Sequence, residues 1–122
     1  MVATWTTDRG RALWSGRLLR DWVAPLVAQI VELVDPDAVW LLGSVARGDD
    51  DADSDIDLLI VLPEFDPADT VDLKRRVHRS VSVPVPFDVA FTDSERFTRR
   101  SRVAGTLERA AVREGRLAHE RG

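Results

Sequence analysis

Residues 42–59 of the chain read LGSVARGDDDADSDIDLL, and most of the information about the fold lies here. A short apolar run, residues 39–42, leads into Gly43, and a second apolar run, residues 56–62, follows the aspartates. Short apolar runs bounded by glycine and polar residues are typical of buried strands. The segment therefore predicts two strands of a sheet, joined by a polar connection over residues 44–53.

Two aspartates, Asp55 and Asp57, stand at the start of the second predicted strand. Side chains two residues apart on a strand point to the same face, so Ile56, Leu58 and Ile60 would bury the other face. Two carboxylates about 5 Å apart repel each other by about 3 kcal/mol at an effective dielectric constant of ~20. A divalent cation would remove that repulsion, and oxygen ligands of this kind suit Mg²⁺.

The turn before this strand offers groups that bind phosphate. Gly43 would let a phosphate approach the backbone closely, and the Ser44 hydroxyl adds a hydrogen-bond donor. Arg47 presents a charged fork that matches a phosphate. A salt bridge between Arg47 and the neighbouring aspartates is an equally good interpretation of that residue.

Gly43-Ser44, ten intervening residues and then Asp55-Ile56-Asp57 together resemble the signature of the DNA polymerase β-like nucleotidyltransferase superfamily. The flanking residues are similar to those of the minimal nucleotidyltransferase (MNT) group, the antitoxin partners of HEPN ribonuclease toxins. The resemblance covers residue 39 to about residue 91. It implies an α/β (α+β) fold of the polymerase β-like nucleotidyltransferase type, with a small mixed sheet flanked by helices.

The resemblance also implies a third carboxylate on a later strand. Asp88 fits, because it interrupts the apolar strand expected over residues 86–91. The other interpretation of Asp88 is an ordinary aspartate on an edge strand. The resemblance implies catalytic and metal-binding roles for three aspartates, Asp55, Asp57 and Asp88, which would hold two Mg²⁺ ions. It implies nucleotide binding by Gly43, Ser44 and Arg47.

The function implied by the MNT resemblance is transfer of AMP from ATP to a protein hydroxyl, a tyrosine on a HEPN toxin, which inactivates the toxin. One alternative is an inactive antitoxin that masks the toxin by contact alone. Another is a small-molecule, aminoglycoside-type nucleotidyltransferase, which is weaker because such enzymes carry an added helical domain. A partner protein or a second copy of the chain would then complete the acceptor site, so we expect a homo- or hetero-oligomer.

The remaining elements follow from apolar spacing and from capping residues. The 122 residues predict a single domain, in which residues 1–16 form a loose polar arm or a short helix. Helical spacing covers residues 17–34, where Pro25 either kinks one helix or lies in the first turn of a second. Further helices are expected over residues 67 to about 82, after Asp93 or Ser94, and over residues 106–114, with a short strand from Leu117.

The overall charge limits the classes of partner. The net charge of −4 argues against generic nucleic-acid binding. Residues 32–72 hold thirteen acids and one base, whereas residues 94–122 hold eight arginines and four glutamates. This asymmetry would suit metal ligands that face phosphate ligands, but the charge pattern alone favours two solvated surfaces of opposite charge. The chain has no cysteine and no apolar run of membrane-spanning length, and we expect a cytoplasmic protein without a membrane partner. Trp22 and Trp40 are predicted in the core. Trp5 and Trp14 lie in a polar segment and could contact a partner, but packing of the terminal segment is the favoured interpretation.

Overall fold

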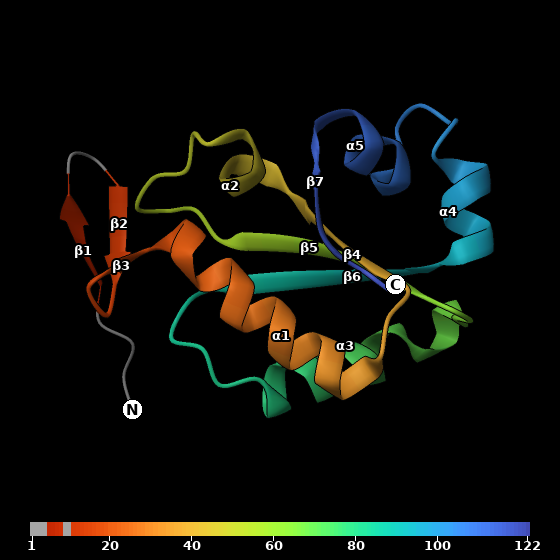
Figure 1. Ribbon diagram of the computed structural model, residues 1–122, viewed down its shortest axis with the longest axis horizontal. Coiled ribbons are helices and arrows are strands. Elements are labelled where there is room, and N and C mark those ends of the chain that lie inside the picture. The colour runs from red at the N-terminus through yellow and green to blue at the C-terminus, as the bar shows by residue number, and fades with distance from the viewer. Residues whose placement is uncertain (1–4, 9–10) are drawn as a thin grey trace.

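The computed structural model describes residues 5–8 and 11–122 and contains two sheets with helices around the larger one (Figure 1). Its strands are β1 (Trp5–Asp8), β2 (Arg11–Trp14), β3 (Arg17–Leu18), β4 (Ala38–Leu42), β5 (Ile56–Leu62), β6 (Phe87–Asp93) and β7 (Arg116–Glu120). Its helices are η1 (Leu19–Trp22), α1 (Val23–Val34), α2 (Gly43–Arg47), η2 (Pro67–Asp69), α3 (Thr70–Ser80), α4 (Ser94–Arg100) and α5 (Leu107–Glu114). Within these described residues, no helix combines the length and the apolar character needed to cross a membrane.

The larger sheet has the strand order β6-β5-β4-β7 and mixes both orientations. Strand β4 pairs antiparallel with β5 and with β7, whereas β5 pairs parallel with β6. A parallel pair needs a long crossover connection, and residues 63–86, which include η2 and α3, supply it. The expected fold, a small mixed sheet flanked by helices, is confirmed.

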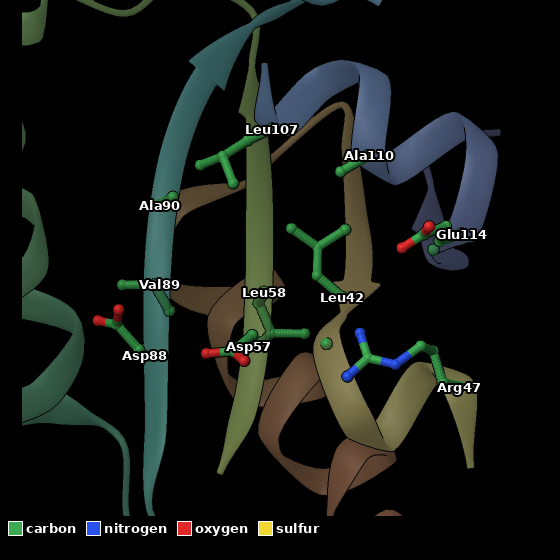
Figure 2. Close-up of a pocket in the computed structure, with 12 residues that line it drawn as sticks. Leu42, Arg47, Asp57, Leu58, Asp88, Val89, Ala90, Leu107, Ala110 and Glu114 are labelled. Carbon is green, nitrogen blue, oxygen red and sulfur yellow. The ribbon is translucent and has the colours of Figure 1, made fainter. Parts of the chain in front are cut away.

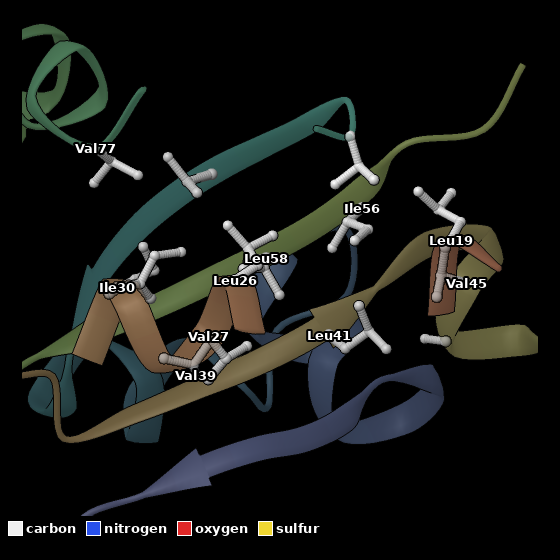
Figure 3. Close-up of a cluster of buried hydrophobic side chains, with 14 of the residues drawn as sticks. Leu19, Leu26, Val27, Ile30, Val39, Leu41, Val45, Ile56, Leu58 and Val77 are labelled. Carbon is white, nitrogen blue, oxygen red and sulfur yellow. The ribbon is translucent and has the colours of Figure 1, made fainter. Parts of the chain in front are cut away.

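The two faces of this sheet pack against different helices. Leu58 and Ile60 of β5 are fully buried on the face that α1 and α3 cover, and Figure 3 shows Leu26 and Ile30 of α1 packed over it. Leu59 points the other way, into a smaller cluster with Ala111 of α5. The alternation along β5 therefore separates a large core from a thin layer under α4 and α5.

Helix α1 resolves the two interpretations of Pro25. The chain makes a short 3-10 turn, η1, before α1 begins at Val23, so Pro25 lies in the first turn of a second helix. Proline is tolerated there because the first backbone N–H groups of a helix have no partner within it. The helix ends at Asp35, which has a left-handed backbone with φ of 47° and is followed by Pro36.

The N-terminal segment differs from the predicted arm or short helix. Strands β1, β2 and β3 form an antiparallel sheet over the described part of this segment, while residues 1–4 and 9–10 of the predicted arm lie outside the described residues. Trp14 is only 9% exposed and packs with the main core, which agrees with the packing role favoured for it and excludes the exposed position. Its carbonyl accepts a hydrogen bond of 2.9 Å from the Trp22 indole, and this contact ties the small sheet to η1. The side chain of Trp5 lies outside the described part of the chain.

Two further expectations need correction. The predicted polar connection contains a short helix, α2, that starts at Gly43. The apolar spacing of the helix expected over residues 67 to about 82 also predicts Val71 on its buried side. Val71 is instead 64% exposed, because α3 turns Val77 toward the core and a residue six positions earlier falls on a different side of the helix. The predicted helix starts are confirmed: the side chains of Asp66, Asp93 and Thr106 each accept a hydrogen bond from a backbone N–H of the helix that they cap.

Candidate active site

Two carboxylates occupy paired positions on adjacent parallel strands of the sheet. Asp57 of β5 and Asp88 of β6 are register partners, so their backbones are about 4.8 Å apart. Each is the second residue of its strand and follows a residue that packs against the main core. Figure 2 shows both side chains at the same end of the strand pair. Strand pairing thus places together two acids that are distant in the sequence.

The remaining predicted carboxylate, Asp55, affects the ionisation of Asp57. Burial, the negative charges of Asp55 and Asp88, and a hydrogen bond with the Asp55 side chain together raise the pKa of Asp57 to about 6, while Arg47 opposes this change. The ordinary pKa of this side chain is 3.8. The negative charge at Asp57 is therefore poorly compensated by the groups around it, which is the condition that favours a bound cation.

Gly43 lies against the Asp57 carboxylate. Its φ is 72°, which is a left-handed conformation, and a Cβ atom at this position would lie 2.6 Å from Oδ2 of Asp57. Any side chain would therefore strain the backbone and displace the carboxylate. The structure gives a physical reason for glycine at this position: it leaves Asp57 uncovered at the point where β4 passes into α2.

A pocket of about 300 Å³ opens beside these groups. Gly43, Arg47, Asp57 and Asp88 line it, together with apolar side chains of the sheet and three residues of α5: Leu107, Ala110 and Glu114 (Figure 2). Ser44 and Asp55 are not among the lining residues. The structure thus brings four of the six predicted site residues to one pocket and places Asp55 next to it.

Arg47 takes part in both of the interactions considered for it in the sequence. Its Nε lies 3.3 Å from Oδ2 of Asp49, and both side chains are about half exposed. The residue also lines the pocket, and it favours the charged form of Asp57. An exposed ion pair of this kind contributes little stability, so a phosphate could displace Asp49 at small cost.

Asp88 has a cationic neighbour, which the sequence did not reveal. Nζ of Lys74, on α3, lies 3.9 Å from Oδ1 of Asp88, and the Asp88 side chain is 59% exposed. Among the described residues, no group of three or more acids or histidines is gathered closely enough to count as a preformed metal cluster. The donor chemistry nevertheless fits Mg²⁺. The carboxylates supply hard oxygen ligands, and Arg47 only partly offsets the repulsion of Asp57 by Asp55 and Asp88.

Helix α5, which walls the pocket, is held by a buried polar network. Thr92 Oγ1 of β6 donates a hydrogen bond of 2.9 Å to Glu108, and Nε of Arg100 on α4 lies 3.2 Å from the same carboxylate oxygen. Thr92 and Glu108 are both buried, so their polar atoms need these partners. The network fixes the first turn of α5 against the sheet.

The contribution of α5 to the site was missed by the sequence analysis. Leu107, Ala110 and Glu114 are three, then four, residues apart and therefore lie on one side of the helix. That spacing was visible in the sequence, but it could not show that this side of the helix faces Asp57. Only the pairing of the sheet and the Glu108 network establish that contact.

Comparisons with known proteins agree with this geometry. The sequence model for a nucleotidyltransferase domain matches residues 25–113, which include every predicted site residue. A crystal structure from Sulfolobus solfataricus, described as a "putative nucleotidyltransferase", superposes with a TM-score of 0.57 at 25% sequence identity and covers 84% of each chain. No curated protein matches the chain. With the matched family spanning most of the sequence and the fold shared with that structure, the chain belongs to the nucleotidyltransferase domain family.

Proposed function

We propose that the protein is a Mg²⁺-dependent enzyme that transfers AMP from ATP to a tyrosine of a HEPN-type ribonuclease toxin and thereby acts as its antitoxin. The observation that carries the proposal is the pairing of Asp57 with Asp88, with Asp55 in hydrogen-bonding reach of Asp57, at the mouth of a mostly apolar pocket. A pocket of about 300 Å³ lies at the lower end of the range for small-molecule sites. Such a protein would act in the cytoplasm, where a ribonuclease toxin meets its RNA.

Asp55, Asp57 and Asp88 would hold two Mg²⁺ ions. When bound, the ions activate the attacking hydroxyl and stabilise the charge on the departing pyrophosphate. Asp88 is exposed whereas Asp57 is partly buried, so Asp88 is the better placed of the two to take the proton of an acceptor hydroxyl. Its contact with Lys74 is long, so it can turn toward Asp57 at little cost.

The nucleotide would lie along the pocket from Gly43 to α5. Gly43 leaves room for phosphate oxygens next to Asp57, and Arg47, which lines the same pocket, supplies donors. The hydroxyl of Ser44, the next residue after Gly43, would add a further donor. The apolar side chains of Leu107 and Ala110 would pack against the base. In the reaction, a bond forms between the acceptor oxygen and the α-phosphorus, while the bond from the α-phosphorus to the oxygen that bridges to the β-phosphate breaks.

The acceptor must come from another molecule if it is a tyrosine. The 122 residues contain no tyrosine. The exposure of Asp88 at the edge strand of the sheet also leaves its side open to a large acceptor. Both observations support transfer to a separate protein.

The test uses a purified HEPN-type ribonuclease as the candidate acceptor. The purified toxin is mixed with about one tenth of an equivalent of the protein, because an enzyme is reused whereas a masking protein needs roughly one equivalent. Radiolabelled ATP with Mg²⁺ should place label on a toxin tyrosine and silence its ribonuclease activity. Asp88→Asn should still form the complex but should neither label nor silence the toxin.

Different outcomes would select the alternatives. Silencing that needs no ATP and follows one-to-one binding would show a masking antitoxin and would refute the enzymatic role. Label that appears on an aminoglycoside and never on the toxin would show a small-molecule transferase instead.

A further inference from the structure

Helix α3 presents a row of basic side chains beside Asp88. We call Lys74, Arg75, His78 and Arg79 the basic strip. Two members contact the strand that carries the carboxylate: Lys74 lies 3.9 Å from Asp88, and the His78 ring stacks on Phe87 with centroids 4.4 Å apart and planes inclined by 10°. The strip therefore has a fixed position next to the open end of the site.

The strip is the part of α3 that the core does not use. Val77 is fully buried, and Arg76 donates a hydrogen bond to the carbonyl of Leu33 on α1, so the opposite side of the helix is committed to packing. Arg75, His78 and Arg79 are exposed. The only acid paired with the strip on α3 itself, among the described residues, is Asp72, at 3.8 Å from Arg75 in an exposed contact that contributes little stability.

The geometry of the reaction directs the acceptor toward this strip. The pocket extends from Asp57 to α2 and α5, and in Figure 2 Asp88 lies on the far side of Asp57 from Arg47 and Glu114. An in-line displacement requires the attacking and leaving oxygens to be on opposite sides of the phosphorus. A nucleotide in the pocket would thus leave the acceptor to approach over β6 and α3.

We propose that the basic strip is the docking surface for an acidic segment of the acceptor protein, next to the hydroxyl that is modified. This inference rests on the proposed function, since that function places the nucleotide in the pocket. The strip runs for about 7.5 Å along the helix, at 1.5 Å per residue, which matches two or three residues of an extended peptide. Charge complementarity at this position would hold the acceptor segment in register with Asp88.

The surroundings favour a short acidic peptide over a nucleic acid. Residues 49–57, in the loop before β5 and at its start, carry six aspartates, and the chain has a net charge of −4. A nucleic-acid strand has a continuous line of phosphates, which these aspartates would repel, whereas a few acidic side chains can contact the strip alone.

The experiment compares two variants with the same change in charge. Arg75→Glu with Arg79→Glu reverses the strip, and Arg99→Glu with Arg102→Glu reverses two exposed arginines at the end of α4. The probes are a fluorescein-labelled peptide with one tyrosine flanked by glutamates, the same peptide with glutamines, and a single-stranded RNA of equal charge. Binding is followed by fluorescence anisotropy, and stabilisation by Mg²⁺ and ATP is followed by thermal melting.

We expect the acidic peptide to bind the wild-type protein and the α4 variant alike, and the strip variant roughly tenfold more weakly, as expected when rim charges are reversed. The glutamine peptide should bind no variant, and the affinity for the acidic peptide should fall as salt rises. All three proteins should keep the same stabilisation by Mg²⁺ and ATP. If the strip variant does not fold, Arg75→Gln with Arg79→Gln removes the same charges without adding acids.

Three results would overturn the docking surface: equal peptide binding by the strip variant, an equal loss in the α4 variant, or tighter strip-dependent binding of the RNA. Failure of Mg²⁺ and ATP to stabilise the wild-type protein, with strip-dependent peptide binding intact, would refute the proposed function and leave the docking surface standing.

Discussion

The two faces of the larger sheet differ in what they contribute: one holds most of the apolar core, and the other holds the candidate active site. A cluster of sixteen buried residues covers the face under α1 and α3 and extends to β2, η1 and α2. The face under α4 and α5 has a cluster of three and also bears the carboxylates and the pocket. Apolar burial is the main source of stability, so most of the folding free energy comes from the first face. The second face can then hold acids that repel one another, because it contributes less to keeping the chain folded.

The strand β5 shows this division within a single element. Leu58 and Ile60 belong to the large cluster, Leu59 to the small one, and Asp57 to the site. Substitutions on opposite sides of this sheet should therefore separate loss of activity from loss of stability.

The largest effect is expected for Asp57→Asn. Removal of this charge should lower nucleotidyl transfer by at least about 10²- to 10³-fold, the range for losing one electrostatic group of an active site. The melting temperature at neutral pH should not fall, because the substitution removes a carboxylate that burial and its neighbours disfavour. Asp53→Asn, at an exposed position in the loop that precedes β5, is the matched control and should keep wild-type transfer. A variant that loses activity only because it unfolds would contradict the separation of the two faces.

The next effect is on the free energy of unfolding, compared between the two faces. Leu26→Ala, at a fully buried position on the first face, should lower the free energy of unfolding by about 2–5 kcal/mol. Leu107→Ala, at a position 50% exposed on the pocket face, should cost less than about 1 kcal/mol but should weaken stabilisation by ATP. Urea unfolding measures both changes. Equal costs at the two positions would show that the faces share stability evenly.

A glycine pair separates backbone strain from crowding at the site. Gly43 and Gly105 both have positive φ, but only at Gly43 would a Cβ meet another atom, Oδ2 of Asp57. Each substitution by alanine should cost about 1–2 kcal/mol for the left-handed backbone. Only Gly43→Ala should also weaken the stabilisation by Mg²⁺ and ATP, as a thermal melt can measure. An equal loss in Gly105→Ala would show that the effect is not local to the carboxylate.

The smallest effect is a dependence of stability on pH. The pKa of Asp57 in the folded protein, about 6, lies above its ordinary value of 3.8, so its contribution to stability is complete below pH 3.8 and is lost as the pH rises through 6. The melting temperature of the wild-type protein without Mg²⁺ should thus fall relative to that of Asp57→Asn between pH 4 and pH 8. Added Mg²⁺ should reduce the difference at high pH, since it binds the charged form. A constant difference across this range would contradict the raised pKa.

Much of this arrangement was readable in the sequence, for identifiable reasons. The strands at residues 38–42 and 56–62 are continuous apolar runs, and the caps at Asp66, Asp93 and Thr106 are local signals. Asp55 and Asp57 stand out because they break the start of such a run. These features depend on neighbours in the sequence, and the structure reproduces them.

The missed features depend on contacts between distant segments. The small sheet is tied to η1 by the hydrogen bond from Trp22 to the Trp14 carbonyl, and α5 is held beside the pocket by the contact between Thr92 and Glu108. Lys74 is an ordinary basic residue until the crossover brings α3 beside β6. Periodicity gives the side of a helix that is apolar, but it does not tell which strand that side will meet.

The parallel pairing of β5 with β6 has a consequence for how such a protein can change over time. The spacing of Asp57 and Asp88 is fixed by the hydrogen-bond ladder between the strands and not by the crossover that joins them. Residues 63–86 can therefore change in length or in the charge of their surface residues while the two carboxylates keep their separation. The residues for chemistry and those for recognition would then lie in separate segments of the chain. Substitutions on the surface of α3 could adapt the protein to a changed partner without altering the carboxylates on β5 and β6.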